Sequence, residues 1–322
     1  MYTPTQLQEI IENAIDQIEY PKTPARLYEP IRYIMGLGGK RIRPALVLMA
    51  ADLFGASIEK AVPAALAIET FHNFTLIHDD IMDNAPLRRG QQSVHEKWGV
   101  NNAILSGDVM MVESNKHLSR LDSKVLKDAL DTFNATAQGV CEGQQLDMEF
   151  EERETVGISE YINMIRLKTA VLLGGAMKLG AQVAGASPEE AAQLYVFGEN
   201  IGIAFQLQDD ILDVYGDPEK FGKQVGGDII ANKKTLLLLE LKERAEASDR
   251  LAITAQSNNP DYADKIARMT ALYNKYDIRG LASQEMRNYS DKAFEALSAL
   301  KVPEERKEEL LLLANQLMNR EH

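Results

Sequence analysis

The segment SPEEAAQLYVFGENIGIAFQLQDDILDVYGD, residues 187–217, predicts one long α-helix. Its apolar residues recur at three- and four-residue spacing, as they do along one face of a helix. Ser187 is a suitable N-cap, Pro188 fits the first turn, and acidic residues follow in that turn. Gly216 and Pro218 then end the helix.

The same helical period recurs through most of the chain. It is clearest in residues 60–84, 124–149, 158–184 and 277–300. Alternating strand patterns and Asn-Gly hairpin signals are absent. The breaks between periodic segments are too short to be linkers. They fall at 36–39, 84–90, 153–159, 216–227 and 258–262. We therefore expect an all-α fold in one domain that covers residues 1–322.

The composition is that of a globular protein with 322 residues, 45% of them hydrophobic and 26% charged. The 35 Lys and Arg residues against 48 Asp and Glu give a net charge of -13, which argues against binding to nucleic acid. The single cysteine, Cys141, excludes an internal disulfide and fits a reducing compartment. The first 20 residues predict an amphipathic helix and no signal peptide, and no apolar run reaches about 18 residues. A cytoplasmic protein without a transmembrane segment is expected.

Two acidic clusters share one spacing. Asp209 and Asp213 are one helical turn apart, roughly 5.4 Å, and so share a face of the predicted helix, as Asp79 and Asp83 do. The residues that follow Asp79 and Asp209 are also aspartates and flank these faces: Asp80 and Asp210. One such cluster is more typical of a solvated helix face, but two copies among apolar residues weaken that interpretation. Oxygen ligands in pairs suit Mg²⁺, which also bridges to phosphate oxygens.

Basic residues accompany the acidic clusters beside predicted turns. Arg88 and Arg89 follow the first cluster, and GGKRIRP, residues 38–44, places three basic residues after two glycines. Glycine lets the backbone approach an anion, and arginine can hold phosphate in a bidentate fork. Further basic residues lie in the Lys168–Thr169 pair and in FGKQVGGDIIANKKT, residues 221–235. The sequence therefore predicts a site for two phosphorylated groups. One is bound through metal ions at the acidic clusters, and the other is held by basic side chains without metal ions.

These motifs resemble those of the trans-isoprenyl diphosphate synthases, in order and in spacing. They are GGKRIRP, DDIMDNAPLRRG, EGQQLD, KT, FQLQDDILD and GKQVGGDIIANKKT, and they span most of the chain. Two DDxxD clusters together with these basic elements are specific to chain-elongating prenyltransferases. The resemblance implies a bundle of long, mostly antiparallel helices around a deep central cavity. It also implies a homodimer with three Mg²⁺ ions in each active site, for which Mn²⁺ can substitute.

The resemblance assigns roles to individual residues. The implied metal ligands are Asp79, Asp83 and Asp209, supported by Asp80, Asp210 and Asp213. The residues implied to contact the allylic diphosphate are Arg88, Lys168, Lys223 and Lys233. Those implied to bind isopentenyl diphosphate are Lys40, Arg43, His72 and Arg89. Thr169 and Gln206 are placed near the reacting carbons, with Gln144 and Asp147 in support.

The implied reaction joins isopentenyl diphosphate to an allylic diphosphate with a dimethylallyl, geranyl or farnesyl chain. Phe74 lies five residues before Asp79, Thr75 lies four before, and Phe71 lies about two turns below, so these side chains are candidates for the floor of the product pocket. In the family that the motifs resemble, an aromatic residue five positions before the first aspartate limits products to short chains. The resemblance therefore implies farnesyl or geranylgeranyl diphosphate, although both phenylalanines could simply pack in the core. A class I terpene cyclase, a longer-chain synthase and a non-catalytic subunit are the alternatives.

Overall fold

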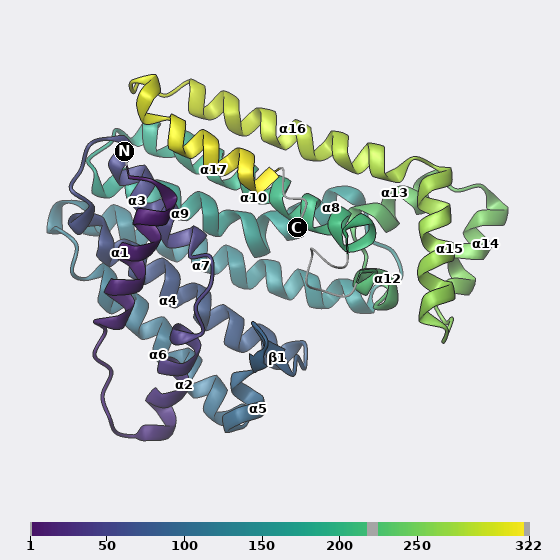
Figure 1. Cartoon of the computed structure of the whole chain (residues 1–322), viewed down its shortest axis with the longest axis horizontal. Helices are drawn as coiled ribbons and strands as arrows, with labels where there is room; N and C mark the ends of the chain where they lie inside the picture. Colours follow the sequence, from purple (N-terminus) through teal and green to yellow (C-terminus); the bar gives the residue numbers. More distant parts are fainter. Residues whose placement is uncertain (1, 218–224, 319–322) are drawn as a thin grey trace. The chain divides into compact units, whose positions relative to one another are not determined.

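The computed structural model describes residues 2–217 and 225–318 (Figure 1). Nearly all of this part is helical, which confirms the all-α prediction. The helices up to residue 183 are α1 (Pro4–Asp16), α2 (Ala25–Gly36), α3 (Ile42–Leu53), α4 (Ile58–Met82), α5 (Val94–Trp98), α6 (Val100–Leu118), α7 (Ser123–Glu152), α8 (Ile158–Ile165), the π-helix η1 (Arg166–Ala170) and α9 (Val171–Val183). Those that follow are α10 (Pro188–Tyr215), α12 (Gly227–Ile230), α13 (Leu236–Arg244), α14 (Ala247–Gln256), α15 (Tyr262–Lys275), α16 (Ile278–Ser298), the 3-10 turn η2 (Glu304–Arg306) and α17 (Glu308–Met318). None of the helices within the described ranges is both long and apolar enough to cross a membrane.

Helix α10 begins and ends where its sequence predicts. The Ser187 hydroxyl accepts a hydrogen bond from the Glu190 backbone N–H at 3.2 Å, and the Glu190 carboxylate accepts one from the Ser187 N–H at 2.9 Å. This reciprocal pair is a capping box. Pro188 is the first helical residue, and Gly216 follows the last one. Pro218, the other predicted stop, lies outside the described residues.

The chain divides into two compact units. Unit 1 comprises Met1–Ala137, Leu172–Tyr195 and Ala299–Leu310, and unit 2 comprises Gln138–Val171, Val196–Ser298 and Leu311–His322. In unit 1, α4 packs against α3 and α6 (Figure 1). In unit 2, α13 packs against α8, α15 and α16, and α15 also contacts α12 and α14. The prediction of one domain over the whole chain stays a prediction.

A short hairpin interrupts unit 1 where the sequence predicts only a break. β1 (Leu87–Arg88) pairs antiparallel with β2 (Gln91–Gln92). The two residues between them, Arg89 and Gly90, have φ of 53° and 75°. Positive φ at both turn positions is the geometry that Asn-Gly usually supplies, so Arg-Gly gave no hairpin signal. Arg88 is thus the last residue of β1, and Arg89 is the first residue of the turn.

Unit 1 also buries a histidine that should make its stability depend on pH. His117, at the end of α6, is 1% exposed, and neither ring nitrogen has a hydrogen-bond partner in the described structure. Burial, reinforced by the nearby Arg120, lowers the pKa of His117 to about 4. An unfolded histidine has a pKa near 6.5, so from pH 6.5 downward the unfolded chain binds a proton that the folded chain does not.

We therefore expect stability to fall as the pH drops from about 6.5 to about 4, with His117 contributing a loss of about 2 kcal/mol at pH 5. The His117→Leu variant should lack this part of the pH dependence, because leucine binds no proton. Urea unfolding of both proteins at several pH values measures it. Parallel stability curves for variant and wild type would contradict the assignment.

Candidate active site

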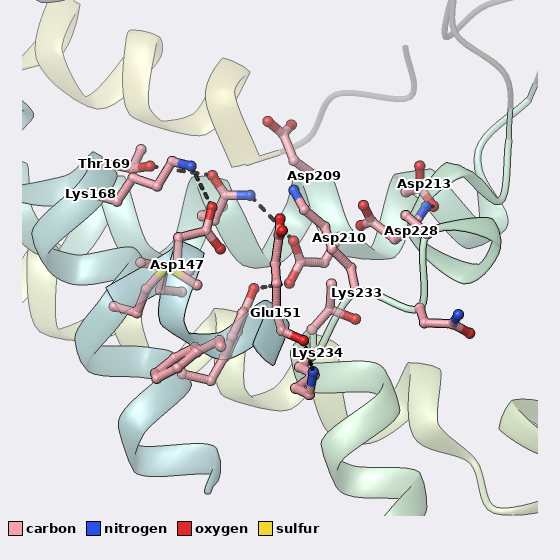
Figure 2. A pocket seen from close by; sticks show the side chains of 18 residues that line it. Asp147, Glu151, Lys168, Thr169, Asp209, Asp210, Asp213, Asp228, Lys233 and Lys234 are labelled. Atoms are coloured by element: carbon pink, nitrogen blue, oxygen red, sulfur yellow. Dashed lines mark hydrogen bonds and ion pairs between the residues drawn. The ribbon is translucent and has the colours of Figure 1, made fainter. Parts of the chain in front are cut away.

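A cavity of about 760 Å³ lies in unit 2 and is rich in charged side chains (Figure 2). Eight of the residues predicted for the site line it: Asp147, Lys168, Thr169, Gln206, Asp209, Asp210, Asp213 and Lys233. Three charged residues and one tyrosine that the sequence does not predict for the site also line it: Glu151, Asp228, Lys234 and Tyr161. The predicted Lys223 lies outside the described residues. The cavity therefore combines carboxylates and ammonium groups, as a site for a metal-bound anion requires.

The three aspartates of α10 differ in their surroundings. Asp210 is 4% exposed, whereas Asp209 and Asp213 are only partly buried. The Tyr161 hydroxyl donates to Asp210 Oδ2, and Gln206 Nε2 donates to Oδ1 at 3.3 Å. Burial raises the pKa of Asp210 to about 7, while these two hydrogen bonds act in the opposite direction. Asp213 accepts a hydrogen bond from the Asp228 backbone N–H at 3.0 Å.

The predicted Lys168 and Thr169 lie on the π-helical turn η1. Lys168 Nζ contacts Asp147 Oδ2 of α7 at 2.5 Å, and Figure 2 shows the two side chains pointing toward each other. The Thr169 hydroxyl donates to Gln206 Oε1 at 3.5 Å. π-helical turns inside α-helices occur frequently at functional sites. Asp147 and Gln206 thus contact Lys168 and Thr169, which the resemblance assigns to the allylic diphosphate and to the reacting carbons, respectively.

Two glycines make room for this turn. A Cβ atom on Gly143 of α7 would lie 2.1 Å from the Lys168 backbone nitrogen. A Cβ atom on Gly202 of α10 would lie 2.6 Å from the Ala170 Cα atom. Any side chain at either position would displace the backbone of η1. Both helices therefore need glycine where they meet the turn.

Unit 1 gathers the predicted cations around the start of α3. Arg43 Nη1 lies 3.3 Å from His72 Nε2, and the Arg89 guanidinium donates to the Gly38 carbonyl. Gly39 has a φ of 136°, and a Cβ atom there would lie 3.0 Å from the Arg89 guanidinium carbon. Glycine at this position therefore permits both the turn and the approach of Arg89. The predicted Lys40 is exposed in the same loop.

Electrostatics favour an anion at these cations. Burial, followed by the charges of Arg43 and Arg89, lowers the pKa of His72 well below its ordinary value. Burial also lowers the pKa of Arg43 and of Arg89. The charge of Glu69 opposes this shift, and the charge of Arg89 at Arg43, and of Arg41 and Arg88 at Arg89, adds to it. In addition, the buried Arg43 Nε has no hydrogen-bond partner within the described ranges. A phosphate group would relieve the repulsion and supply the missing acceptor.

A buried ion pair shapes the loop that carries these cations. Arg41, which has a left-handed φ of 45°, places Nη1 2.5 Å from Glu69 Oε1 and Nη2 2.7 Å from the Met35 carbonyl oxygen. Glu12 accepts from Arg41 Nε at 2.9 Å. Arg41 belongs to the GGKRIRP motif, but these contacts give it a structural part in the loop. Lys40 and Arg43 of the same motif take no part in this ion pair.

The first aspartate cluster lies at the end of α4. The Asp83 backbone N–H donates to the Asp79 carbonyl at 2.8 Å, which confirms that the two residues are one helical turn apart. Asp83 is exposed and Asp79 is partly buried. Asp80 is fully buried and forms an ion pair with Arg88, whose Nε lies 3.0 Å from Asp80 Oδ1. Arg88, predicted to contact diphosphate, is thus held by a carboxylate of the same segment.

The donor atoms fit a hard divalent cation that binds together with a phosphorylated ligand. Within residues 2–217 and 225–318, no group of three or more His, Cys, Asp or Glu side chains is placed to hold a metal ion alone. Mg²⁺ typically takes one or two carboxylates and completes its shell with waters and phosphate oxygens. The pairs Asp79 with Asp83 and Asp209 with Asp213 offer carboxylates of this kind at the ends of rigid helices.

The candidate chain-length residues form an aromatic row on α4. The Phe71 ring is fully buried and packs against Phe133 with ring centroids 5.4 Å apart. Phe74 is partly buried, with its ring 5.5 Å from Phe71 and 4.7 Å from His78. The Thr75 hydroxyl donates to the His72 carbonyl at 2.8 Å. Elsewhere, Gln144 on α7 is 8% exposed.

Comparison with known proteins identifies the family. The polyprenyl synthetase family matches residues 24–273. A geranylgeranyl diphosphate synthase from Methanosarcina mazei is 43% identical over 242 residues, which cover 74% of each chain. A short chain isoprenyl diphosphate synthase from Methanothermobacter thermautotrophicus is 39% identical over 301 residues, 93% of this chain and 92% of the relative.

The fold comparison agrees with the sequence comparison. The crystal structure of a geranylgeranyl pyrophosphate synthase matches with a TM-score of 0.94 and 40% identity and covers 99% of both chains. The match therefore extends over nearly the whole chain. The chain belongs to the polyprenyl synthetase family, the trans-isoprenyl diphosphate synthases, and is a prenyltransferase.

Proposed function

We propose that this chain condenses isopentenyl diphosphate with an allylic diphosphate and releases geranylgeranyl diphosphate and pyrophosphate. The observation that carries the proposal is the unit 2 cavity, in which Lys168, Thr169 and Asp209 lie together. The names of two similar synthases, at 43% and 39% identity, support a short-chain product. The family match leaves no observation that favours a terpene cyclase.

The allylic diphosphate binds to the acidic cavity and its lysines. Lys168 and Lys233, with Arg88 and Lys223, contact its oxygens. Asp79, Asp83 and Asp209, supported by Asp80, Asp210 and Asp213, hold Mg²⁺ (three ions, with Mn²⁺ as a substitute), which neutralises charge on the departing diphosphate. Asp147 keeps the Lys168 ammonium in place through their 2.5 Å contact.

Isopentenyl diphosphate binds to the cations of unit 1. Arg43, Arg89, Lys40 and His72 donate to its diphosphate, and no metal ion is needed because the cations alone match its charge. His72, whose pKa is lowered, is neutral at pH 7 and donates one N–H. This arrangement leaves the alkene of the substrate outside the charged site, available for the reaction.

The proposed reaction uses these groups in successive steps. The allylic C–O bond breaks, and its electron pair leaves with the diphosphate. The alkene of isopentenyl diphosphate then supplies the electron pair of the new C–C bond, and a proton passes to the released pyrophosphate. Cationic side chains stabilise the leaving group. The Thr169 hydroxyl and the Gln206 amide orient their dipoles near the allylic carbon. A homodimer remains a prediction from the family resemblance, and a cytoplasmic location remains a prediction from the sequence.

Product analysis tests this function. The purified chain is incubated with labelled isopentenyl diphosphate, Mg²⁺ and a dimethylallyl, geranyl or farnesyl primer, and the dephosphorylated products are separated by length. We expect geranylgeraniol as the longest main product from every primer. Longer polyprenols as the main product would instead indicate a long-chain synthase, and no product at all from the single chain would indicate a non-catalytic subunit.

Phe74 is expected to set the product length. In Phe74→Ala the partly buried ring on α4 is lost, so the pocket gains roughly one isoprene unit of depth. Chromatography of dephosphorylated products should show a shift to longer chains. Phe133→Leu, which alters only the core ring beyond Phe71, serves as the control and should keep the wild-type length. An unchanged length in Phe74→Ala would remove Phe74 as the pocket floor.

A further inference from the structure

The buried hydroxyl of Tyr161, on α8, donates a hydrogen bond to a carboxylate. The residue is 3% exposed, and its ring packs in an apolar cluster with Met164, Leu207 and Ile211. Its hydroxyl donates to Asp210 Oδ2 of α10. A buried phenol needs such a partner, but the partner here is a carboxylate from the second aspartate cluster.

This hydrogen bond is part of a series in which each donor and acceptor is defined. Asp210 Oδ1 accepts from Gln206 Nε2 at 3.3 Å, so the Gln206 amide presents its oxygen in the other direction. That oxygen accepts from the Thr169 hydroxyl at 3.5 Å. These hydrogen bonds thus run from the π-helical turn through Gln206 to Asp210. Gln206 donates to one oxygen of the Asp210 carboxylate, and Tyr161 donates to the other.

We propose that Tyr161 is a positioning residue that fixes the Asp210 carboxylate and thereby ties the second aspartate cluster to the turn bearing Thr169. The inference rests on the proposed function, because it concerns the site for metal-bound diphosphate. A carboxylate with one donor can rotate about its terminal torsion, which is broad and roughly two-fold. Donors on both oxygens fix its plane.

The position of Tyr161 in the sequence also supports a connection between Asp210 and the π-helical turn. It lies seven residues before Lys168 in one continuous helical run, α8 followed by η1. A contact at Tyr161 therefore anchors the same element whose next turns carry Lys168. In this way one hydroxyl constrains α10 and the start of the π-helical turn together.

Replacing Tyr161 with phenylalanine removes one oxygen and keeps the ring. We expect Tyr161→Phe to fold and to bind inorganic diphosphate in the presence of Mg²⁺ about 10- to 100-fold more weakly, as for loss of a hydrogen bond to a charged group. Isothermal titration calorimetry of the full chain measures this without turnover. In steady-state assays the Mg²⁺ concentration for half-maximal rate should rise by a similar factor.

Tyr273→Phe is the matched control. Tyr273 is also a buried tyrosine of unit 2, at 2% exposure, but it does not line the cavity that holds Asp210. We expect this variant to bind diphosphate as the wild type does. In a double-mutant cycle, adding Tyr161→Phe to Asp210→Asn should have little further effect, since the hydroxyl acts through that carboxylate.

The outcomes separate this inference from the proposed function. Unchanged Mg²⁺-dependent diphosphate binding in a folded Tyr161→Phe protein would overturn the inference, as would an equal loss in Tyr273→Phe or failure of Tyr161→Phe to fold, which would make the role purely structural. Wild-type chain that binds diphosphate with Mg²⁺ but forms no prenyl product would overturn the proposed function and leave the role of Tyr161 intact.

Discussion

Gly143→Ala is expected to reduce kcat about 10²-fold while the chain stays folded. The new methyl group would lie 2.1 Å from the Lys168 backbone nitrogen, and no side-chain rotation can relieve a contact with backbone. The η1 turn must shift, and a displacement of about 1 Å at a reacting group costs roughly this factor. Overpacking should also lower the free energy of unfolding by about 1–3 kcal/mol.

Gly139→Ala provides the control for this variant. It makes the same change one turn earlier on α7, but its methyl group would meet only Val171 and Leu167 side-chain carbons at 3.4 and 3.5 Å, which is ordinary contact. Alanine favours a helix over glycine by up to about 1 kcal/mol, so this variant should keep its activity and gain slight stability. Steady-state kinetics and urea unfolding measure both. Equal behaviour of the two variants would refute the close packing of Gly143 on η1.

Asp209→Asn is expected to lower kcat about 10²- to 10³-fold. Asp209 lies on the cavity wall, partly exposed, so the loss of its charge should leave the fold intact and weaken the stabilisation of the leaving group. The Mg²⁺ concentration for half-maximal rate should rise as well, since a neutral amide binds a divalent cation more weakly than a carboxylate does. Kinetics over a Mg²⁺ series at saturating substrate give both quantities.

Asp217→Asn removes the same charge two residues after the end of α10, at an exposed position that is not part of the cavity wall. We expect near wild-type kinetics from it. A similar loss in both variants would point to a general effect of net charge, and full activity of Asp209→Asn would exclude Asp209 as a metal ligand.

The sequence predicts the long helices because each carries its own signals. The apolar period and the capping residues of α10 are local, so its start at Pro188 and its end before Gly216 agree with the structure. The sequence does not predict the turn at Arg89 and Gly90, because arginine seldom occupies a left-handed position. A hairpin of two-residue strands also leaves no alternating pattern to detect.

The details of the site depend on contacts between distant segments. The segment 158–184 predicts one regular helix, but residues 166–170 form a π-helix against Gly143 and Gly202, a change that the apolar spacing does not reveal. Tyr161 has the spacing of an ordinary core aromatic, and its partner Asp210 lies 49 residues away. Likewise, Arg88 resembles a free phosphate ligand in sequence, whereas Asp80 already binds it.

The most direct test of the account follows the transfer of label from isopentenyl diphosphate to farnesyl diphosphate by the purified chain, with Mg²⁺ and with an excess of chelator. The account predicts a product longer by one isoprene unit that forms only when both diphosphates and the metal ion are present. Label transfer that persists in the chelator, or a hydrocarbon product formed from farnesyl diphosphate alone, would contradict it.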